Sequence, residues 1–315
     1  MNLASPACKL LPGILFVLSI LTFAQTAKPT VESIDDTVID REPATWTSPE
    51  SVLSELRSAN DETRLRALKL AGLNDQQAHY AVWSQVNDGA SKIIGQAVVT
   101  PKRTQLMYAA LGEDASQQAV IAFDDGIQSV YAAVADHKGN GWERIAALTC
   151  WCKYDMRPEQ DMVSEFVSLR PTMEPGSPDN QIHRELVVHS SGGGSGVYSQ
   201  SETHFRVYHN QLRNIISFTS AYRNGTPTVT LERRWFTFLS LPNLPAPDTL
   251  RGVLVEAKGT WEPDNAPTIQ WDVRALLDRH LRSVTCTAYR WDEKTFSYVR
   301  TNETVPACSP YAKSQ

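Results

Sequence analysis

The feature that most constrains this chain is a long region in which apolar and polar residues alternate in short segments. The segments are rich in Val, Ile, Thr and aromatic residues, and turn-forming residues such as Asp124-Asp125-Gly126 and Lys138-Gly139-Asn140-Gly141 separate them. A period of two places successive side chains on opposite faces of a β-strand, and short turns join neighbouring strands in antiparallel order. We therefore predict that residues 90–308 form an antiparallel, hairpin-rich β domain, either sandwich-like or propeller-like. The segments are 92–99, 105–111, 118–123, 127–135, 143–152, 184–189, 204–209, 213–218, 228–236, 268–273, 286–291 and 296–300.

Residues 48–75 follow the period of an α-helix instead. Ser48 and Pro49 suit the start of one helix, Asn60 suits the start of a second, and Gly72 suits its end. Two helices alone cannot bury their apolar stripes, so we expect the pair to pack on the β domain. The chain is then mainly β, and α+β overall. The stripes consist of Val52, Leu53, Leu56, Leu65, Leu68 and Ala71. A helical pattern also occurs at 273–281, within the β region.

Residues 1–24 have the layout of a secretory signal peptide. Lys9 precedes an apolar run at 10–23, and Thr22-Phe23-Ala24 places small residues at the −3 and −1 positions of a cleavage site. The run is short for a membrane span, although an uncleaved anchor is the alternative. We expect a secreted or periplasmic protein with no stable membrane span after cleavage. The polar and acidic residues 25–47 are expected to form a linker or an extended arm.

Four cysteines remain after removal of such a signal: Cys150, Cys152, Cys286 and Cys308. An even number in an exported chain predicts disulfides. Zinc is the competing interpretation, but these cysteines lack the paired C-x-x-C spacing of zinc sites. On a strand, Cys150 and Cys152 would lie about 6.5–7 Å apart with parallel Cβ vectors, and Trp151 would point the other way. We therefore expect each of the two to bond to Cys286 or Cys308, in an order that the sequence leaves open.

The glycine-rich stretch HSSGGGSGVYSQ, residues 189–200, raises the possibility of a catalytic or phosphate-binding loop. No Lys follows the glycines as a Walker loop requires, and Gly193-Gly194-Ser195-Gly196-Val197 lacks the last glycine of a nucleophile elbow. Both motifs also need a following helix, whereas an alternating strand follows here. We therefore predict a β-hairpin with a long, flexible glycine tip.

Histidines near this hairpin are candidate metal ligands. His183, Glu185 and His189 share one face of a predicted strand, and His204 lies on its partner, so zinc or copper is one interpretation. The other is that Leu186 and Val188 point inward while the His and Glu face points to water. No short-range ligand pair such as H-E-x-x-H is present, which favours the second interpretation and no metal.

Aromatic residues are frequent in the β region and raise the possibility of a glycan-binding surface. Tyr289, Trp291, Phe296 and Tyr298 fall where partners in a hairpin touch, which favours cross-strand packing. The candidate ligand-binding residues that remain are His189, Trp151 and Tyr198.

Two segments resemble known repeat families. Asp61, Arg64, Ala67 and Leu68 match positions of a HEAT-type helical repeat, and 135–149 and 184–218 look like the β-hairpins of FG-GAP or VCBS-type extracellular repeats. Together they resemble uncharacterised secreted bacterial proteins that join a HEAT-like helix pair to such a β region. The FG-GAP resemblance implies a calcium-binding turn, but Lys138 occupies a ligand position, and a cation there opposes Ca²⁺.

Function is constrained more by what is missing than by any motif. The net charge of −5 gives no electrostatic footprint for nucleic acid, and no catalytic triad, acid/base pair or cofactor motif follows from residue spacing. We expect an exported, non-catalytic binding or envelope-associated protein whose partner is an extracellular or periplasmic protein or glycan. The alternatives are a secreted hydrolase with a site assembled from distant residues, and a structural accessory of another secreted protein.

Overall fold

The computed structural model describes residues 38–85, 91–114, 116–126, 129–151, 162–171, 183–194, 197–224, 229–240, 250–261 and 283–302. Most of these residues lie in β-strands, and the strands form three sheets in which neighbouring strands run antiparallel. The mainly β prediction is therefore confirmed. The predicted strand at 268–273 and the helical pattern at 273–281 lie outside the described residues.

The first large sheet, here called the six-stranded sheet, has the order β1-β8-β7-β6-β5, with β2 also paired to β8. The hairpin between β7 and β8 turns at Gly139, whose φ of 57° lies in the left-handed region that glycine adopts without strain. Its strands are β1 (Val38–Asp40), β2 (Ala44–Trp46), β5 (Thr104–Ala109), β6 (Gln118–Asp124), β7 (Ser129–Lys138) and β8 (Gly141–Trp151).

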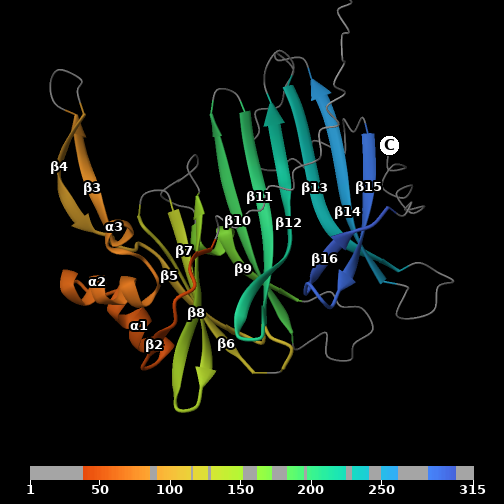
Figure 1. Cartoon of the computed structure of the whole chain (residues 1–315). Helices are drawn as coiled ribbons and strands as arrows, with labels where there is room; N and C mark the ends of the chain where they lie inside the picture. The colour runs from red at the N-terminus through yellow and green to blue at the C-terminus, as the bar shows by residue number, and fades with distance from the viewer. Residues whose placement is uncertain are drawn as a thin grey trace, which may run out of the picture. The chain divides into compact units, whose positions relative to one another are not determined.

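The second large sheet, here called the eight-stranded sheet, is a meander in which consecutive strands are neighbours (Figure 1). His209 and Asn210 turn the chain between β11 and β12 with φ of 47° and 61°, the left-handed geometry that suits the twist of a two-residue hairpin. The strands are β9 (Val167–Pro171), β10 (Arg184–Gly194), β11 (Val197–Tyr208), β12 (Gln211–Asn224), β13 (Val229–Ser240), β14 (Leu250–Trp261), β15 (Ser283–Asp292) and β16 (Ser297–Arg300).

The glycine-rich stretch differs from its prediction. β10 continues to Gly194 and β11 begins at Val197, with Gly192 paired to Ser199 and Gly194 paired to Val197. The hairpin itself is confirmed, but the long flexible tip is wrong. Glycine has low strand propensity, yet the ladder of β10 and β11 carries these glycines as paired residues.

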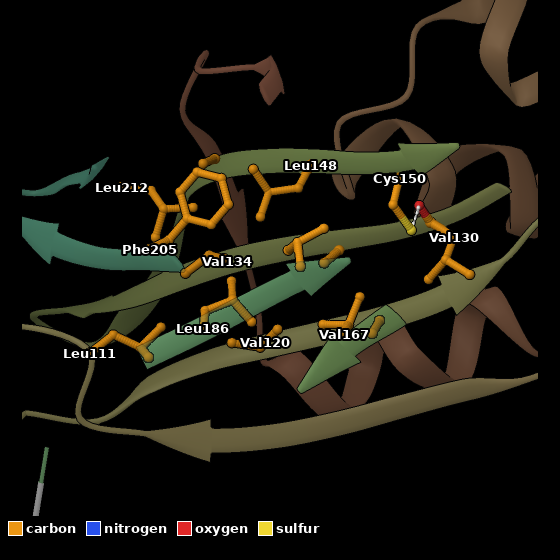
Figure 2. Packing of buried hydrophobic residues seen from close by; sticks show 14 of the residues in the cluster. Leu111, Val120, Val130, Val134, Leu148, Cys150, Val167, Leu186, Phe205 and Leu212 are labelled. Carbon is orange, nitrogen blue, oxygen red and sulfur yellow. Dashed lines mark hydrogen bonds between the residues drawn. The ribbon is translucent and has the colours of Figure 1, made fainter. Parts of the chain in front are cut away.

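The two large sheets pack face to face across a shared apolar core (Figure 2). Val120, Val134 and Leu148 from the six-stranded sheet meet Leu186 and Phe205 from the eight-stranded sheet in this cluster. Alternating side chains of each strand supply the core, as expected for stacked sheets. The arrangement is a sandwich rather than a propeller.

Two helices cover the other face of the six-stranded sheet. These are α1 (Pro49–Leu56), which Ser48 caps, and α2 (Asp61–Leu70), which Asn60 caps. Their buried residues pack with Ile121, Phe123 and Tyr131 of β6 and β7. The helix pair therefore buries its apolar stripes on the β region, as the sequence predicts, and the six-stranded sheet is apolar on both faces.

The chain after α2 is held close to β8. Gly72 has a φ of +99°, and a Cβ at this position would lie 2.3 Å from both Ala147 Cβ and Arg144 Nη1. Glycine is therefore required both by the backbone conformation and by the close approach to β8. Downstream of Gly72 the chain continues through α3 (Asp75–Ala78) into a separate hairpin of β3 (His79–Gln85) and β4 (Ser91–Val98).

Part of the predicted linker belongs to the folded domain. Residues 38–46 contain β1 and β2, and both pair with β8. The buried Arg144 side chain donates to Asp40 Oδ2 at 2.5 Å and to the Glu42 carbonyl oxygen at 2.7 Å, which fastens this segment to the sheet. Strands of three residues are too short to show a period, so the sequence pattern did not reveal them.

Several elements were not predicted. These are α3, β3, β9, β14 and the short helix α4 (Met162–Phe166). Most of them are short, and β14 combines the buried Val253 and Val255 with glycines and charged residues, so its sequence pattern is weak. Pairing with β13 and β15 on both sides organises β14 despite this weak pattern.

Candidate functional site

Strands β9, β10 and β11 bring five ionisable side chains together on one face of the eight-stranded sheet. Leu186 and Val188 point into the core between the sheets, so the alternate residues of β10 point to the opposite face. His189 stands opposite Glu202 in the strand register, and Glu185 stands opposite Arg170. We call this group the His204 cluster. It consists of Arg170, Glu185, His189, Glu202 and His204.

His204 lies at the centre of the cluster, between two carboxylates. Its Nδ1 is 2.7 Å from Glu185 Oε2, and its Nε2 is 2.7 Å from Glu202 Oε1. Because carboxylate oxygens accept, the charged imidazolium donates from both nitrogens. Glu202 also accepts from Arg170 Nη1 at 2.7 Å, so each cation at the centre has a carboxylate partner.

Burial and the neighbouring charges shift the pKa values of His204 and Glu202 in opposite directions. Burial alone would lower the pKa of His204, but hydrogen bonds to Glu185 and Glu202 outweigh it and leave the pKa raised. Burial would likewise raise the pKa of Glu202, yet the hydrogen bond and charge of His204, with the charges of His189 and Arg170, lower it to about 2. The raised pKa of His204 favours the imidazolium form, in which both ring nitrogens donate to carboxylates and neither can accept a proton.

The sequence analysis predicts that this face points to water, and that prediction is wrong. Glu185, Glu202 and His204 are only 7%, 8% and 6% exposed. The face has an apolar layer of its own, in which the Phe218 ring lies 6.0 Å from the His204 ring. Within the part of the chain that the structure describes, no three His, Cys, Asp or Glu side chains are grouped so that they could hold a metal ion.

Aromatic residues of β15 and β16 pack on one another. Trp291 and Tyr298 are cross-strand partners with ring centroids 5.1 Å apart, and Trp291 meets Phe296 edge-on at 4.9 Å. Phe236 of β13 joins them at 5.0 Å from Tyr298. These tilted and edge-on contacts are typical of packed aromatic clusters and support the packing interpretation over a glycan platform.

The three candidate ligand-binding residues lie on different elements. His189 belongs to the His204 cluster, where its Nδ1 is 3.6 Å from Glu202 Oε2. Tyr198 is paired with Gly193 on the β10–β11 hairpin, and Trp151 is paired with Ser129 on the other large sheet. The side chains of Tyr198 and Trp151 lie outside the described part of the structure.

The cysteine prediction is tested only in part. Cys150 is buried in the core between the sheets, where its Sγ lies 3.5 Å from the carbonyl oxygen of Val130 (Figure 2). Cys286 lies on β15, and no disulfide joins these two described cysteines. Cys152 and Cys308 lie outside the described residues, so the two bridges stay a prediction.

A groove of about 650 Å³ is the second candidate site. It lies where the end of α1, the chain leading into β5, and α4 meet. Its volume is within the range of about 300–1,000 Å³ that is typical of small-ligand sites. We call it the cationic groove. Its lining residues are Arg57, Pro101, Lys102, Arg103, Thr104, Gln105, Val163 and Ser164.

Hydrogen bonds between separate elements position the groove's cations. Arg57 follows the last turn of α1, and its Nε donates to Thr104 Oγ1 at 2.6 Å. The buried Asp124 carboxylate accepts from the backbone N–H groups of Lys102 at 2.7 Å and Gly126 at 3.1 Å. Burial raises the pKa of Asp124, which these backbone bonds partly offset. The segment that carries Lys102 and Arg103 is thus tied to the end of β6.

Positive charge predominates among the described lining residues of the groove. Three of its lining residues, Arg57, Lys102 and Arg103, are cations, and no carboxylate is among the described lining residues. The whole chain carries a net charge of −5, so this positive region opposes the overall charge. Arg57 and Thr104 lie 47 positions apart, so spacing in the sequence did not reveal that they meet. The adjacent cations Lys102 and Arg103 were the only sequence feature that pointed to this groove.

Another hollow, of about 500 Å³ beside β8 and β12, shows the contrast. It contains Arg41, Arg144 and Arg213, but Glu143 lines it as well, and Arg144 is already paired with Asp40 at 2.5 Å. Its cations are therefore partly balanced within the chain. The cationic groove is the stronger candidate for an anionic ligand.

Comparison with protein-family models, curated proteins and solved structures finds no match to this chain. The resemblance to HEAT-type and FG-GAP or VCBS-type repeats therefore stays a prediction. None of the described helices is both long enough and apolar enough to cross a membrane.

Proposed function

We propose that the protein is an exported, non-catalytic binding protein whose ligand is an anion held in the cationic groove. One observation carries the proposal: Arg57, Lys102 and Arg103 converge on a cavity of ligand size whose described lining contains no carboxylate. Charge-assisted hydrogen bonds from Arg and Lys to anionic oxygens are among the strongest polar contacts that a protein surface offers.

The geometry of the His204 cluster favours binding over hydrolysis as the function. A hydrolase would need a general base near its substrate. Among the described residues, His204 at the centre of the cluster is the candidate for that base. Both of its ring nitrogens face carboxylates at 2.7 Å, and its side chain is buried. These contacts support a structural role, so the secreted hydrolase is the weaker alternative.

Export rests on sequence features. The apolar run at 10–23 with its Thr22-Phe23-Ala24 site, and the four later cysteines, support a secreted or periplasmic location. An anion-binding protein outside the cytoplasm would meet acidic glycans, acidic proteins and inorganic anions.

Isothermal titration of the purified protein with sodium tripolyphosphate tests the proposal. We expect saturable binding that weakens as NaCl is raised, since salt screens exposed charges. The double variant Arg57→Gln/Lys102→Gln should bind at least about 10-fold more weakly, because each lost charge-assisted bond contributes about 1.5–3 kcal/mol.

The matched control is Arg66→Gln/Lys69→Gln, which removes the same charge from α2, outside the groove. It should bind within about twofold of the original protein, since distant exposed charges are screened. No binding at low salt, or equal weakening by both double variants, would contradict an anion site in the groove.

A further inference from the structure

The hollow of about 500 Å³ beside β8 and β12 carries charges of both signs that are not paired with each other. Arg41, Glu143 and Arg213 line it from the link between β1 and β2, the start of β8 and the start of β12. Arg144 also lines it but is paired with Asp40, whereas the other three form no ion pair among the described residues. We call this cavity the mixed-charge hollow. Its volume is in the range typical of small-ligand sites.

The strand framework holds the three unpaired charges on separate elements. Pairing with β2 and β7 on its two sides fixes the backbone of β8 at Glu143, and pairing with β11 fixes β12 at Arg213. Arg41 Nη1 donates to the carbonyl oxygen of Leu212 at 3.1 Å, which places the guanidinium beside β12 and leaves its charge without a carboxylate. A ligand that enters the hollow therefore meets both signs of charge on a backbone that is already hydrogen-bonded.

A ligand with a single kind of charge fits this lining poorly. Glu143 repels a purely anionic ligand, and Arg41 and Arg213 repel a purely cationic one. A neutral ligand would displace water from all three groups without replacing the charge-assisted hydrogen bonds, which costs free energy. A ligand that carries both signs can pair with all three groups at once.

The number of charges narrows the ligand further. Two guanidinium groups and one carboxylate are matched by two carboxylates and one ammonium group. Guanidinium groups bind carboxylates through paired hydrogen bonds, and an ammonium group donates three hydrogen bonds to oxygen acceptors. An acidic amino acid has this set of groups. The exposed amide of Gln211, which also lines the hollow, supplies a further donor and acceptor.

We propose that the mixed-charge hollow binds an acidic amino acid, free or within a short peptide, with the ammonium group on Glu143 and the carboxylates on Arg41 and Arg213. The proposal is independent of the anion site in the cationic groove, because the two cavities share none of their described lining residues. The protein then has two binding sites, one selective for negative charge and one selective for a combination of charges.

Titration calorimetry with five probes tests the proposal. L-glutamate and L-alanyl-L-glutamate carry the complete set of charges, and the tighter of the two distinguishes a free amino acid from a peptide. N-acetyl-L-glutamate lacks the ammonium group, L-glutamine lacks one carboxylate, and L-lysine has one carboxylate and two ammonium groups. We expect saturable binding of at least one complete probe and at least about 10-fold weaker binding of the other three, a loss of roughly 1.4 kcal/mol.

Variants of the hollow assign each charge to its partner. Glu143→Gln should weaken L-glutamate about 10-fold and should not weaken N-acetyl-L-glutamate, because only the first has an ammonium group. Arg213→Gln should weaken both. The matched controls are Glu62→Gln and Arg300→Gln, which change exposed residues outside the hollow and should leave L-glutamate binding within about twofold.

The outcomes separate this proposal from the anion site. If neither complete probe binds, or if N-acetyl-L-glutamate binds as tightly as L-glutamate, the proposal is overturned. If Arg57→Gln/Lys102→Gln abolishes L-glutamate binding and Glu143→Gln does not weaken it, the amino acid occupies the cationic groove and the hollow is not its site. Tripolyphosphate binding should be unchanged in Glu143→Gln, so either site can fail without the other.

Discussion

The His204 cluster and the cationic groove both gather charged side chains, but they place the counter-charge differently. In the cluster, His204 lies between Glu185 and Glu202, and Arg170 binds Glu202 as well. In the groove, three cations line an open cavity without a carboxylate among the described lining residues. The counter-charge of the buried His204 lies within the chain, whereas the described lining of the open groove carries only positive charge.

This difference teaches how to separate a structural ionic group from a ligand site. A buried charge must be compensated inside the protein, because desolvation costs several kcal/mol per ion. An exposed cation has no such requirement and can be compensated by a molecule from solution. The location of the counter-charge is therefore a better guide to ligand binding here than the number of histidines or acids.

The largest expected effect comes from breaking the balance of the cluster. Glu202→Ala should lower the free energy of unfolding by about 3–5 kcal/mol, because it leaves His204 and Arg170 without a shared carboxylate partner. Urea unfolding followed by circular dichroism measures this change.

The control for this prediction is Glu55→Ala, which removes the exposed pair with Arg66 and should cost at most about 1 kcal/mol. If Glu202→Ala does not fold, Glu202→Gln keeps the volume and one acceptor and should cost about 1–3 kcal/mol. Equal, small losses for Glu202 and Glu55 variants would show that the cluster does not stabilise the fold.

A second, smaller effect should appear in the pH dependence of stability. The pKa of Glu202 falls from 4.5 to about 2 on folding, so its contribution is present above pH 4.5 and is lost as the pH falls toward 2. The pKa of His204 is raised above 6.5, so its contribution is full below pH 6.5 and is lost as the pH rises through the folded value. The cluster should therefore stabilise most between pH 4.5 and 6.5.

Urea unfolding of the original protein and Glu202→Gln across this range checks the prediction. The difference between them should be greatest between pH 4.5 and 6.5 and should shrink as the pH falls toward 2, where Glu202 becomes protonated in the folded protein. The charges of His189 and Arg170 also lower the pKa of Glu202. The Arg170→Gln variant therefore serves as a comparison, because it removes a cation beside Glu202 and keeps the carboxylate. If the difference in the free energy of unfolding does not change with pH, the ionisation of Glu202 and His204 does not contribute to stability as predicted.

The smallest effect on stability is expected in the groove. Arg57→Gln/Lys102→Gln should change the free energy of unfolding by less than about 0.5 kcal/mol in the absence of ligand, because both side chains are exposed. The same urea titration measures it. A loss above about 1 kcal/mol would mean that these cations support the fold, and the contrast between the two sites would weaken.

Local features of the chain were predictable from the sequence. Ser48 and Asn60 cap the two helices, and Gly72 takes the left-handed conformation that ends the second. The alternation of Leu186 and Val188 correctly gave the core-facing side of β10. These features depend on interactions within a few residues, and such interactions are visible in the sequence itself.

The rest was decided by tertiary contacts. The burial of Glu185 and His204 depends on a second apolar layer over the sheet, to which Phe218 and Phe296 belong. Period-two alternation shows that such residues share a face of the sheet, but it does not show whether that face is exposed to solvent or buried.

The sequence by itself determined the mainly β class, the core-facing side of β10, the helix caps and the turns at Gly139 and at His209 and Asn210, because each depends on the conformational preferences of neighbouring residues. Only the tertiary structure decided that the His and Glu face is buried and that Arg57 meets Lys102 and Arg103 at one groove. Burial and electrostatic balance are sums over residues distant in the chain, and no local pattern encodes which of those residues will meet.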